Sequence, residues 1–287
     1  MRLIFLSLIL IFSSNLSFAQ AFQRIEKNTN LDKLRNTTGV AIADYDQDGD
    51  LDVFVVAKSD FSQIEPTTWS RLLSNNNDGT FEDVTVEAGF LGLHDYDIVD
   101  PGWEFGIKMG ASWGDYNNDG FPDLFLTNYL SFQLYHNNGD GTFEDVTTAA
   151  GLPEKDSCYN YTALWWDVNR DGFLDLFVPN WKGCNRNKFY QNNGDGTFTE
   201  ITAGSGLLPT LDPTNFYGIQ GFFKDFNNDG FIDLMVSGDN HYLFYNNGDG
   251  TFQNAPNPFS SNQIQSFSVG DINHDGFLDI YAGYANG

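Results

Sequence analysis

The sequence contains few basic residues, two cysteines and four histidines. Lysine and arginine together number 14 against 39 acidic residues, which gives a formal net charge of −25. A chain this acidic is repelled by nucleic acid and by anionic membrane surfaces, so the composition argues against both partners. Sustained helical periodicity is also missing, which argues against a helical repeat protein.

The sequence has a single long apolar run, and it lies at the N-terminus. Arg2 precedes the run LIFLSLILIF, and the small-x-small pattern Ser17-Phe18-Ala19 follows before Gln20. About 20 apolar residues are needed to span a bilayer, so this run is too short for a membrane anchor. We interpret residues 1–19 as a cleaved secretory signal peptide and residues 20–287 as one domain. No later stretch is apolar enough for membrane insertion, and no cysteine follows the cleavage point directly to accept a lipid.

The two cysteines are Cys158 and Cys184, and both are equally far from Asp171. If the residues on either side of Asp171 pair as an antiparallel hairpin, the cysteines lie opposite each other. In an exported protein this arrangement predicts a disulfide. The alternative is two unrelated buried thiols, which leaves the symmetric spacing unexplained.

Against this background the acidic residues follow a rule. Five nine-residue segments share the pattern Asp, x, Asp/Asn, x, Asp, Gly, x, x, Asp: residues 44–52, 115–123, 167–175, 225–233 and 271–279. Sixteen of the 39 acidic residues stand at positions 1, 3, 5 and 9 of these segments. Three or four carboxylates so close together repel one another unless a cation lies between them, so the pattern indicates a hard cation bound by oxygen.

Each position of the segment has a predicted task. Positions 1, 3, 5 and 9 offer side-chain oxygens, position 7 offers its carbonyl, and glycine at position 6 permits the positive φ of a sharp turn. All-oxygen ligands favour Ca²⁺ over Zn²⁺ and over the more rigidly coordinated Mg²⁺. We therefore predict up to five structural Ca²⁺ ions. The predicted ligands are Asp44, Asp46, Asp48, Asp50, Asp52, Asp115, Asn117, Asp119, Phe121, Asp123, Asp167, Asn169, Asp171, Phe173, Asp175, Asp225, Asn227, Asp229, Phe231, Asp233, Asp271, Asn273, Asp275, Phe277 and Asp279.

Two alternative assignments of these loops do not fit the sequence. An EF-hand needs a glutamate at position 12 and a following helix. Position 12 is apolar in all five copies: Val55, Leu126, Val178, Val236 and Ala282. Plain Asx turns rich in aspartate do not explain five copies with the same spacing.

A second motif recurs after each of the first four loops, in forms such as NNGDGTFEDVT. The loop starts are 71, 52, 58 and 46 residues apart, which suits a four-stranded propeller blade with insertions. Apolar runs flank every loop, and an aromatic run precedes each of the last three NNGDGTF turns. The sequence therefore predicts an all-β propeller with four complete repeats and a partial fifth. Because the fifth repeat stops after its second strand, we expect an incomplete or open propeller and a chain that continues elsewhere.

Alternating strands place the predicted cation loops on one face and the long insertions on the other. Insertions of this length are usually functional. We expect the partner, an extracellular protein or glycan, to bind there. The candidate residues on that face are Trp69, His94, Asp97, Trp103 and Trp181.

Catalytic motifs are weak in this sequence. Gly110-Ala111-Ser112-Trp113-Gly114 fits the esterase pattern GxSxG, but Ser112 stands three residues before a cation loop, in a predicted strand and not at a strand-to-helix turn. The histidines show no metalloprotease spacing. The only acidic cluster with a histidine on the insertion face surrounds His94 and includes Asp95, Asp97, Asp100 and Glu104. We therefore expect no enzyme, with a polysaccharide lyase or hydrolase as the alternative.

The DxDxDG loops, the apolar strands and the NNGDGTF turns resemble the FG-GAP/VCBS repeat family, which also builds the head of integrin α chains. The chain is similar, too, to a secreted group of cartilage-acidic-protein type. The resemblance implies a β-propeller with Ca²⁺ in the loops and partners on the opposite face. It implies a non-catalytic binding or adhesion scaffold; the alternative is a carbohydrate-active or lectin-like propeller.

Overall fold

The structure is a computed structural model that describes residues 37–57, 70–90, 108–128, 131–154, 158–180, 187–207, 220–237, 241–256, 259 and 264–284. These residues form strands, turns and bends without a helix, so the described part of the chain offers no helical membrane span. The predicted all-β class is confirmed.

The described strands form four four-stranded antiparallel sheets and one two-stranded sheet. Blade 1 contains β1 (Thr37–Ala43), β2 (Asp52–Ala57), β3 (Arg71–Asn75) and β4 (Phe81–Asp83). Blade 2 contains β5 (Lys108–Gly114), β6 (Asp123–Asn128), β7 (Ser131–Asn137) and β8 (Phe143–Asp145). Blade 3 contains β9 (Leu164–Trp166), β10 (Asp175–Val178), β11 (Lys188–Asn192) and β12 (Phe198–Glu200). Blade 4 contains β13 (Gln220–Lys224), β14 (Asp233–Ser237), β15 (Tyr242–Asn246) and β16 (Phe252–Asn254). The fifth sheet contains β17 (Ile264–Gly270) and β18 (Asp279–Tyr284).

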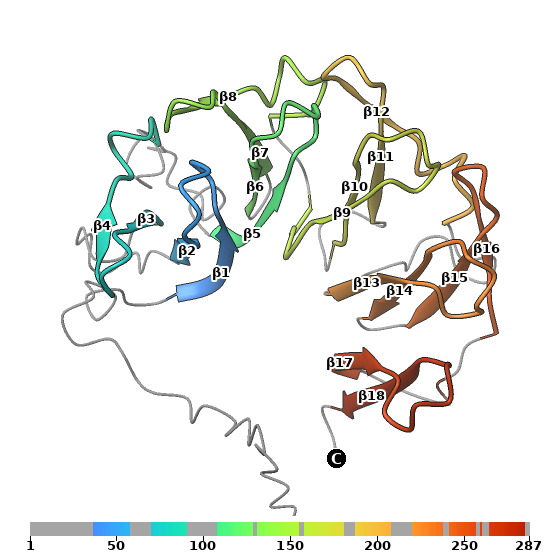
Figure 1. The fold of residues 1–287 in the computed structure, drawn as a ribbon. Helices are drawn as coiled ribbons and strands as arrows, with labels where there is room; N and C mark the ends of the chain where they lie inside the picture. Colours follow the sequence, from blue (N-terminus) through green and yellow to red (C-terminus); the bar gives the residue numbers. More distant parts are fainter. Residues whose placement is uncertain are drawn as a thin grey trace, which may run out of the picture.

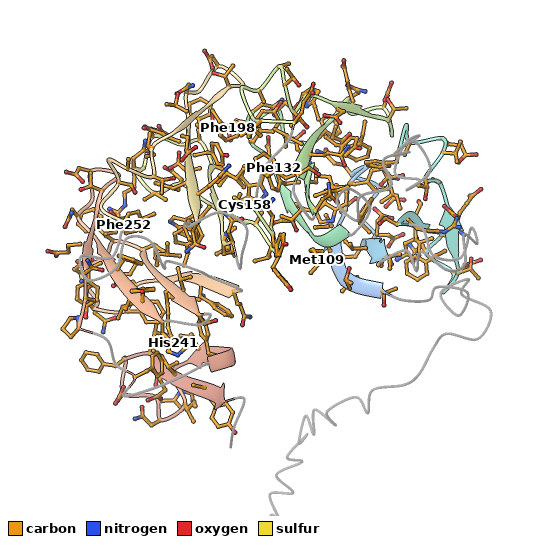
Figure 2. The ribbon with its side chains drawn as sticks, turned by 180° about the vertical axis from the view of Figure 1, so that it is seen from behind. Met109, Phe132, Cys158, Phe198, His241 and Phe252 are labelled. Atoms are coloured by element: carbon orange, nitrogen blue, oxygen red, sulfur yellow. The ribbon has the colours of Figure 1, made fainter. Side chains whose placement is uncertain are left out.

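The five sheets follow one another around an arc, as Figure 1 shows. In blades 1–4 the first strand lies toward the centre of the arc and the fourth strand lies at its outer rim. Phe198 and Phe252, labelled in Figure 2, mark the outer strands β12 and β16. The described sheets do not close a ring, so this part of the chain forms an open β-propeller of four blades and a partial fifth.

A repeated packing rule holds neighbouring blades together. The residue two places after the ninth loop position points toward the next blade and is fully buried in blades 1–4: Phe54, Phe125, Phe177 and Met235. Phe125, for example, packs with Leu176 and Val178 of blade 3. Residues two and four places before the loop, such as Trp165 and Ala163, point back toward the preceding blade. Each blade therefore supplies half of two interfaces, as in other repeat proteins.

At the two ends of the arc, the residues equivalent to those buried between blades are exposed, because the described structure places no sheet against them. Tyr281 of the fifth sheet is equivalent to Phe125, yet it is 74% exposed. In blade 1, Val40 and Ile42 point away from blade 2 and are 59% and 57% exposed. The stabilising contribution of these positions thus depends on a neighbouring sheet.

This rule predicts unequal effects of the same truncation at equivalent positions. Phe177→Ala should lower the free energy of unfolding by about 3–5 kcal/mol, because it empties a buried interface. Tyr281→Ala should change it by less than about 0.5 kcal/mol, because the ring lies in solvent. Urea unfolding of both variants is the measurement, and equal losses would contradict the packing rule.

Candidate functional site

All five predicted cation loops lie at the same end of their sheets. In chain order, loops 1 to 5 connect β1 to β2, β5 to β6, β9 to β10, β13 to β14 and β17 to β18 (Figure 1). In blades 1–4 the turn between the third and fourth strands lies at this end too, since the strands alternate in direction. The loops and these turns therefore form one face, the loop face.

Each loop folds around its own carboxylates. In loop 2, Asp115 Oδ2 accepts a hydrogen bond from Gly120 N at 2.9 Å, and Asp119 Oδ1 accepts one from Phe121 N at 2.9 Å. Gly120 has a φ of 95°, which an L residue rarely adopts. The other four loops repeat both bonds, so the nine-residue pattern specifies one backbone shape.

Loop 1 has the donor set that best fits a hard cation. Asp44, Asp46 and Asp48 each place one carboxylate oxygen so that all three lie within 4.8 Å of one another. Asp44 Oδ1 is buried and accepts no hydrogen bond within the described structure. Burying such an oxygen without a partner is costly, and a Ca²⁺ ion, which binds carboxylate oxygens at 2.3–2.6 Å, would satisfy it.

Loops 2–5 differ from loop 1 because asparagine stands at position 3. In loop 2 the side-chain amide of Asn117 donates to Asp119 Oδ2 at 2.8 Å, while Asn117 Oδ1 accepts from Asp119 N. Asn169, Asn227 and Asn273 make the same amide contact with position 5. These loops carry two carboxylates fewer than loop 1, because asparagine stands at position 3 and phenylalanine at position 7.

The aspartate at position 9 is the innermost group of each loop. Asp123 is fully buried and accepts two backbone hydrogen bonds, from Tyr116 N at 3.1 Å and from Asn137 N at 2.8 Å. Asp52, Asp175 and Asp233 repeat this arrangement. Asp279 accepts the equivalent first bond, from Ile272 N. Both oxygens of the four buried carboxylates thus tie the loop to its own blade.

Burial acts against the charge of these four aspartates. It raises the pKa of Asp52, Asp123 and Asp175 to about 6, and it raises the pKa of Asp233. The backbone N–H groups lower each pKa in part, because they stabilise the ionised form. A nearby divalent cation would offset the remaining cost of the buried charge.

The sequence did not reveal that the side chain of His136, on β7, lies against the carboxylates of loop 2. Its Nδ1 lies 3.0 Å from Asp123 Oδ1, and its Nε2 lies 3.9 Å from Asp119 Oδ2. The sequence feature that could have indicated this contact is the position of His136 directly before Asn137, whose backbone amide donates to Asp123. Among the described blades, the equivalent residues are Ser74, Gln191 and Tyr245, so loop 2 has a distinct neighbour.

The rings at position 7 pack on the neighbouring turn. A Cβ added at Gly139 would lie 2.7 Å from the Phe121 ring, and the same conflict arises at Gly194 with Phe173 and at Gly248 with Phe231. In blade 1 position 7 is Asp50, and the matching turn residue is Asn77 with a φ of 56°. Glycine is therefore required in the turn where a phenylalanine covers it.

The rejected alternatives fit the structure poorly as well. Ser112 lies within β5, paired with Phe125 of β6, and so does not occupy a strand-to-helix turn. Position 12 of the loops lies on the second strand of each sheet, and Val55, Leu126, Val178 and Val236 are buried there. The EF-hand alternative is excluded for these four loops.

Several predicted residues fall outside the described part of the chain. These are Trp69, His94, Asp97, Trp103, Trp181 and Cys184, together with the signal peptide. Their roles stay predictions. Cys158 is described and fully buried, and Asn160 pairs with Asn180 in an antiparallel bridge close to it. The predicted antiparallel pairing is thus confirmed, but its register is not centred on Asp171, since Trp166 lies opposite Asp175 and Asn160 opposite Asn180. The disulfide stays a prediction.

A cleft of about 570 Å³ lies at the opposite end of blade 2 from its cation loop. It is lined by Phe132, Gln133, Asp145, Thr147, Thr148, Ala149 and Glu154, which come from the start of β7, the end of β8 and the connection that follows. Phe132, labelled in Figure 2, lies behind this lining and is itself fully buried in the core between blades 2 and 3. Thr148 Oγ1 donates to Glu154 Oε1 at 2.8 Å. The lining is rich in hydrogen-bond acceptors.

Comparison with known proteins gives distant relatives. Cartilage acidic protein 1 of Homo sapiens is 28% identical over 149 residues, which cover 49% of this chain and 22% of that protein. The Mus musculus protein of the same name is 27% identical over 153 residues and covers 53% of this chain and 23% of its own length. The chain thus spans less than a quarter of these two curated relatives.

A solved structure shares the fold. It is a lectin of Agrocybe aegerita, described for its specific recognition of non-reducing terminal N-acetylglucosamine. The two chains are 20% identical, and the match covers 86% of this chain and 61% of the lectin with a TM-score of 0.51.

The family model described as an FG-GAP-like repeat matches residues 115–178, 167–220 and 225–282. The three matches begin at Asp115, Asp167 and Asp225, the first positions of three predicted cation loops, and together they cover more than half of the sequence. The resemblance noted from the loops and turns is therefore confirmed. The chain belongs to the FG-GAP-like repeat family.

Proposed function

We propose that this chain is a secreted, calcium-stabilised propeller that binds a glycan through the face opposite its cation loops and catalyses no reaction. The observation that carries the proposal is the division between its two faces. Carboxylates gather on the loop face, and the cleft beside Asp145 and Glu154 opens at the other end of the strands. Structure and recognition are thus assigned to separate surfaces.

The loops suit a structural Ca²⁺ ion, because their carboxylates hold the loop backbone and, in blades 1–4, tie it to the blade. The side chains at positions 1, 3, 5 and 9 and the carbonyl at position 7 would hold the ion, and in blades 1–4 the buried aspartate at position 9 would also tie the loop to its blade. Extracellular calcium modules bind with dissociation constants of roughly 10⁻⁴ to 10⁻³ M. At about 1 mM calcium, a site of roughly 0.1 mM contributes about 1.4 kcal/mol, and five such sites contribute about 7 kcal/mol. That total is comparable to the net stability of a domain.

The cleft supports a glycan ligand on chemical grounds. Sugar hydroxyl groups donate hydrogen bonds, and the exposed carboxylates of Asp145 and Glu154 line the cleft. The lectin that shares this fold recognises a sugar, according to its description. Secretion rests on the predicted signal peptide, and the predicted Cys158–Cys184 disulfide is consistent with an oxidising compartment.

Calcium removal should lower the melting temperature by more than about 10 °C, because each bound ion stabilises only the folded state. Thermal unfolding in 1 mM calcium and in EDTA measures this. Asp44→Asn should lose about 1.4 kcal/mol of the calcium-dependent stabilisation. When both proteins are in EDTA, the variant and the unmodified protein should melt at the same temperature. The control is Asp78→Asn in the turn of the same blade, where the side chain binds Thr80 and should leave the calcium response unchanged. An identical melting curve with and without calcium would overturn this assignment.

Glycan binding is tested by an array, followed by titration of the best ligand. Glu154→Gln should weaken binding about tenfold, because a charged acceptor contributes about 1.5–3 kcal/mol to a hydrogen bond. Glu144→Gln alters an exposed glutamate on β8 outside the cleft and should bind normally. Equal affinities of the two variants would contradict a role of the cleft, and an array without binding would favour a protein partner.

A further inference from the structure

The fourth residue of every cation loop has a left-handed backbone. The φ angles are 60° at Gln47, 59° at Asn118, 62° at Arg170, 58° at Asn228 and 59° at His274. This conformation is uncommon for residues other than glycine and costs free energy. Its repetition at one position indicates that the side chain is needed there.

That side chain reaches the next loop along the arc. Gln47 Nε2 donates to Gly120 O at 2.6 Å, Asn118 Nδ2 donates to Gly172 O at 2.7 Å, and Asn228 Nδ2 donates to Gly276 O at 3.1 Å. Arg170 Nη2 donates to Gly230 O in the same way, and its guanidinium lies 4.4 Å from the centre of the Phe231 ring. Four consecutive loop pairs are therefore linked, always from position 4 to position 6.

The accepting peptide group is held from both sides. Its carbonyl, at Gly172 for example, binds the preceding loop, and its N–H, at Phe173, donates to Asp171 Oδ1 at 2.9 Å. Fixing this peptide plane positions the carboxylate at position 5 and the carbonyl at position 7. Both are predicted cation ligands, so one loop orders the binding groups of the next.

The link also acts in the reverse direction. Position 4 lies between positions 3 and 5, which are both predicted ligands, so an ion bound there restrains the donor residue. A restrained donor loses less conformational entropy when it binds the next carbonyl. Thermodynamic coupling is reciprocal, so each loop favours ion binding in the other.

We propose that Gln47, Asn118, Arg170 and Asn228 are positioning residues that couple neighbouring loops in series, so that the loops bind calcium cooperatively. This inference rests on the proposed calcium binding and adds a mechanism to it. Uptake of an ion by one loop raises the affinity of its neighbours, and the loop face becomes ordered as a unit. The donor side chains do not contact the ion themselves.

The test removes one link without straining the backbone. Asn118→Gly deletes the amide and tolerates the left-handed φ, whereas alanine would introduce strain. Asn118→Gln restores a donor, since glutamine serves at the same position of loop 1. The matched control is Asn77→Gly, because Asn77 has a φ of 56° and its backbone amide binds within its own turn, to Asn75.

Calcium titration by calorimetry gives the Hill coefficient and the mean affinity for each protein. The unmodified protein, Asn118→Gln and Asn77→Gly should show a Hill coefficient above 1. Asn118→Gly should show a lower coefficient, and the product of its site affinities should be weaker by about fivefold, the lower end of typical coupling between two sites. In EDTA, hydrogen exchange at the Phe173 amide should be faster in Asn118→Gly than in Asn77→Gly.

Two results would overturn the proposal in distinguishable ways. If the unmodified protein takes up no calcium, the calcium assignment and the coupling both fail. If it takes up calcium with a Hill coefficient of 1, or if Asn118→Gly titrates like the unmodified protein, the coupling alone fails and the loops bind independently.

Discussion

A buried aspartate joins each cation loop of blades 1–4 to the third strand of its blade. In blade 2, Asp123 accepts the backbone amide of Asn137, and the Asn137 side chain donates to Pro122 O and to Tyr45 O of blade 1. Asn192 and Asn246 make equivalent contacts with the preceding blade. The buried aspartate and the asparagine of the third strand therefore connect the loop to its own blade and to the preceding blade. This arrangement costs free energy, because a carboxylate is buried.

Apolar packing depends on the same register. Phe125 reaches blade 3 only because Asp123 ends the loop two residues earlier, and a one-residue shift would turn the ring to the other face of the sheet. Backbone hydrogen bonds at the outer rim, such as Phe198 N to Ala150 O at 2.9 Å, join the blades a second time. The loop pattern thus specifies both the turn and the blade interface.

The strands, the blade order and the loop face could be predicted from sequence, because each is local and repeated four or five times. The links from Asn118 to Gly172 and from His136 to Asp123 could not. They depend on the spacing between loops or strands that are distant in sequence, and that spacing is set by packing. Blades 2–4 combine phenylalanine at position 7 with glycine in the turn, as in Phe121 and Gly139, whereas blade 1 combines Asp50 with Asn77. The sequence shows this difference, but only the contact between the ring and the turn explains it.

We propose that cations on the loop face hold this network in place while the opposite face stays available for a ligand. Site-resolved hydrogen exchange with and without calcium tests it most directly. Calcium should slow exchange at Tyr116 and Val168, whose amides donate to the buried aspartates, and should leave exchange at Thr148 beside the cleft unchanged. Equal exchange at Tyr116 and Val168 in calcium and in EDTA would contradict it.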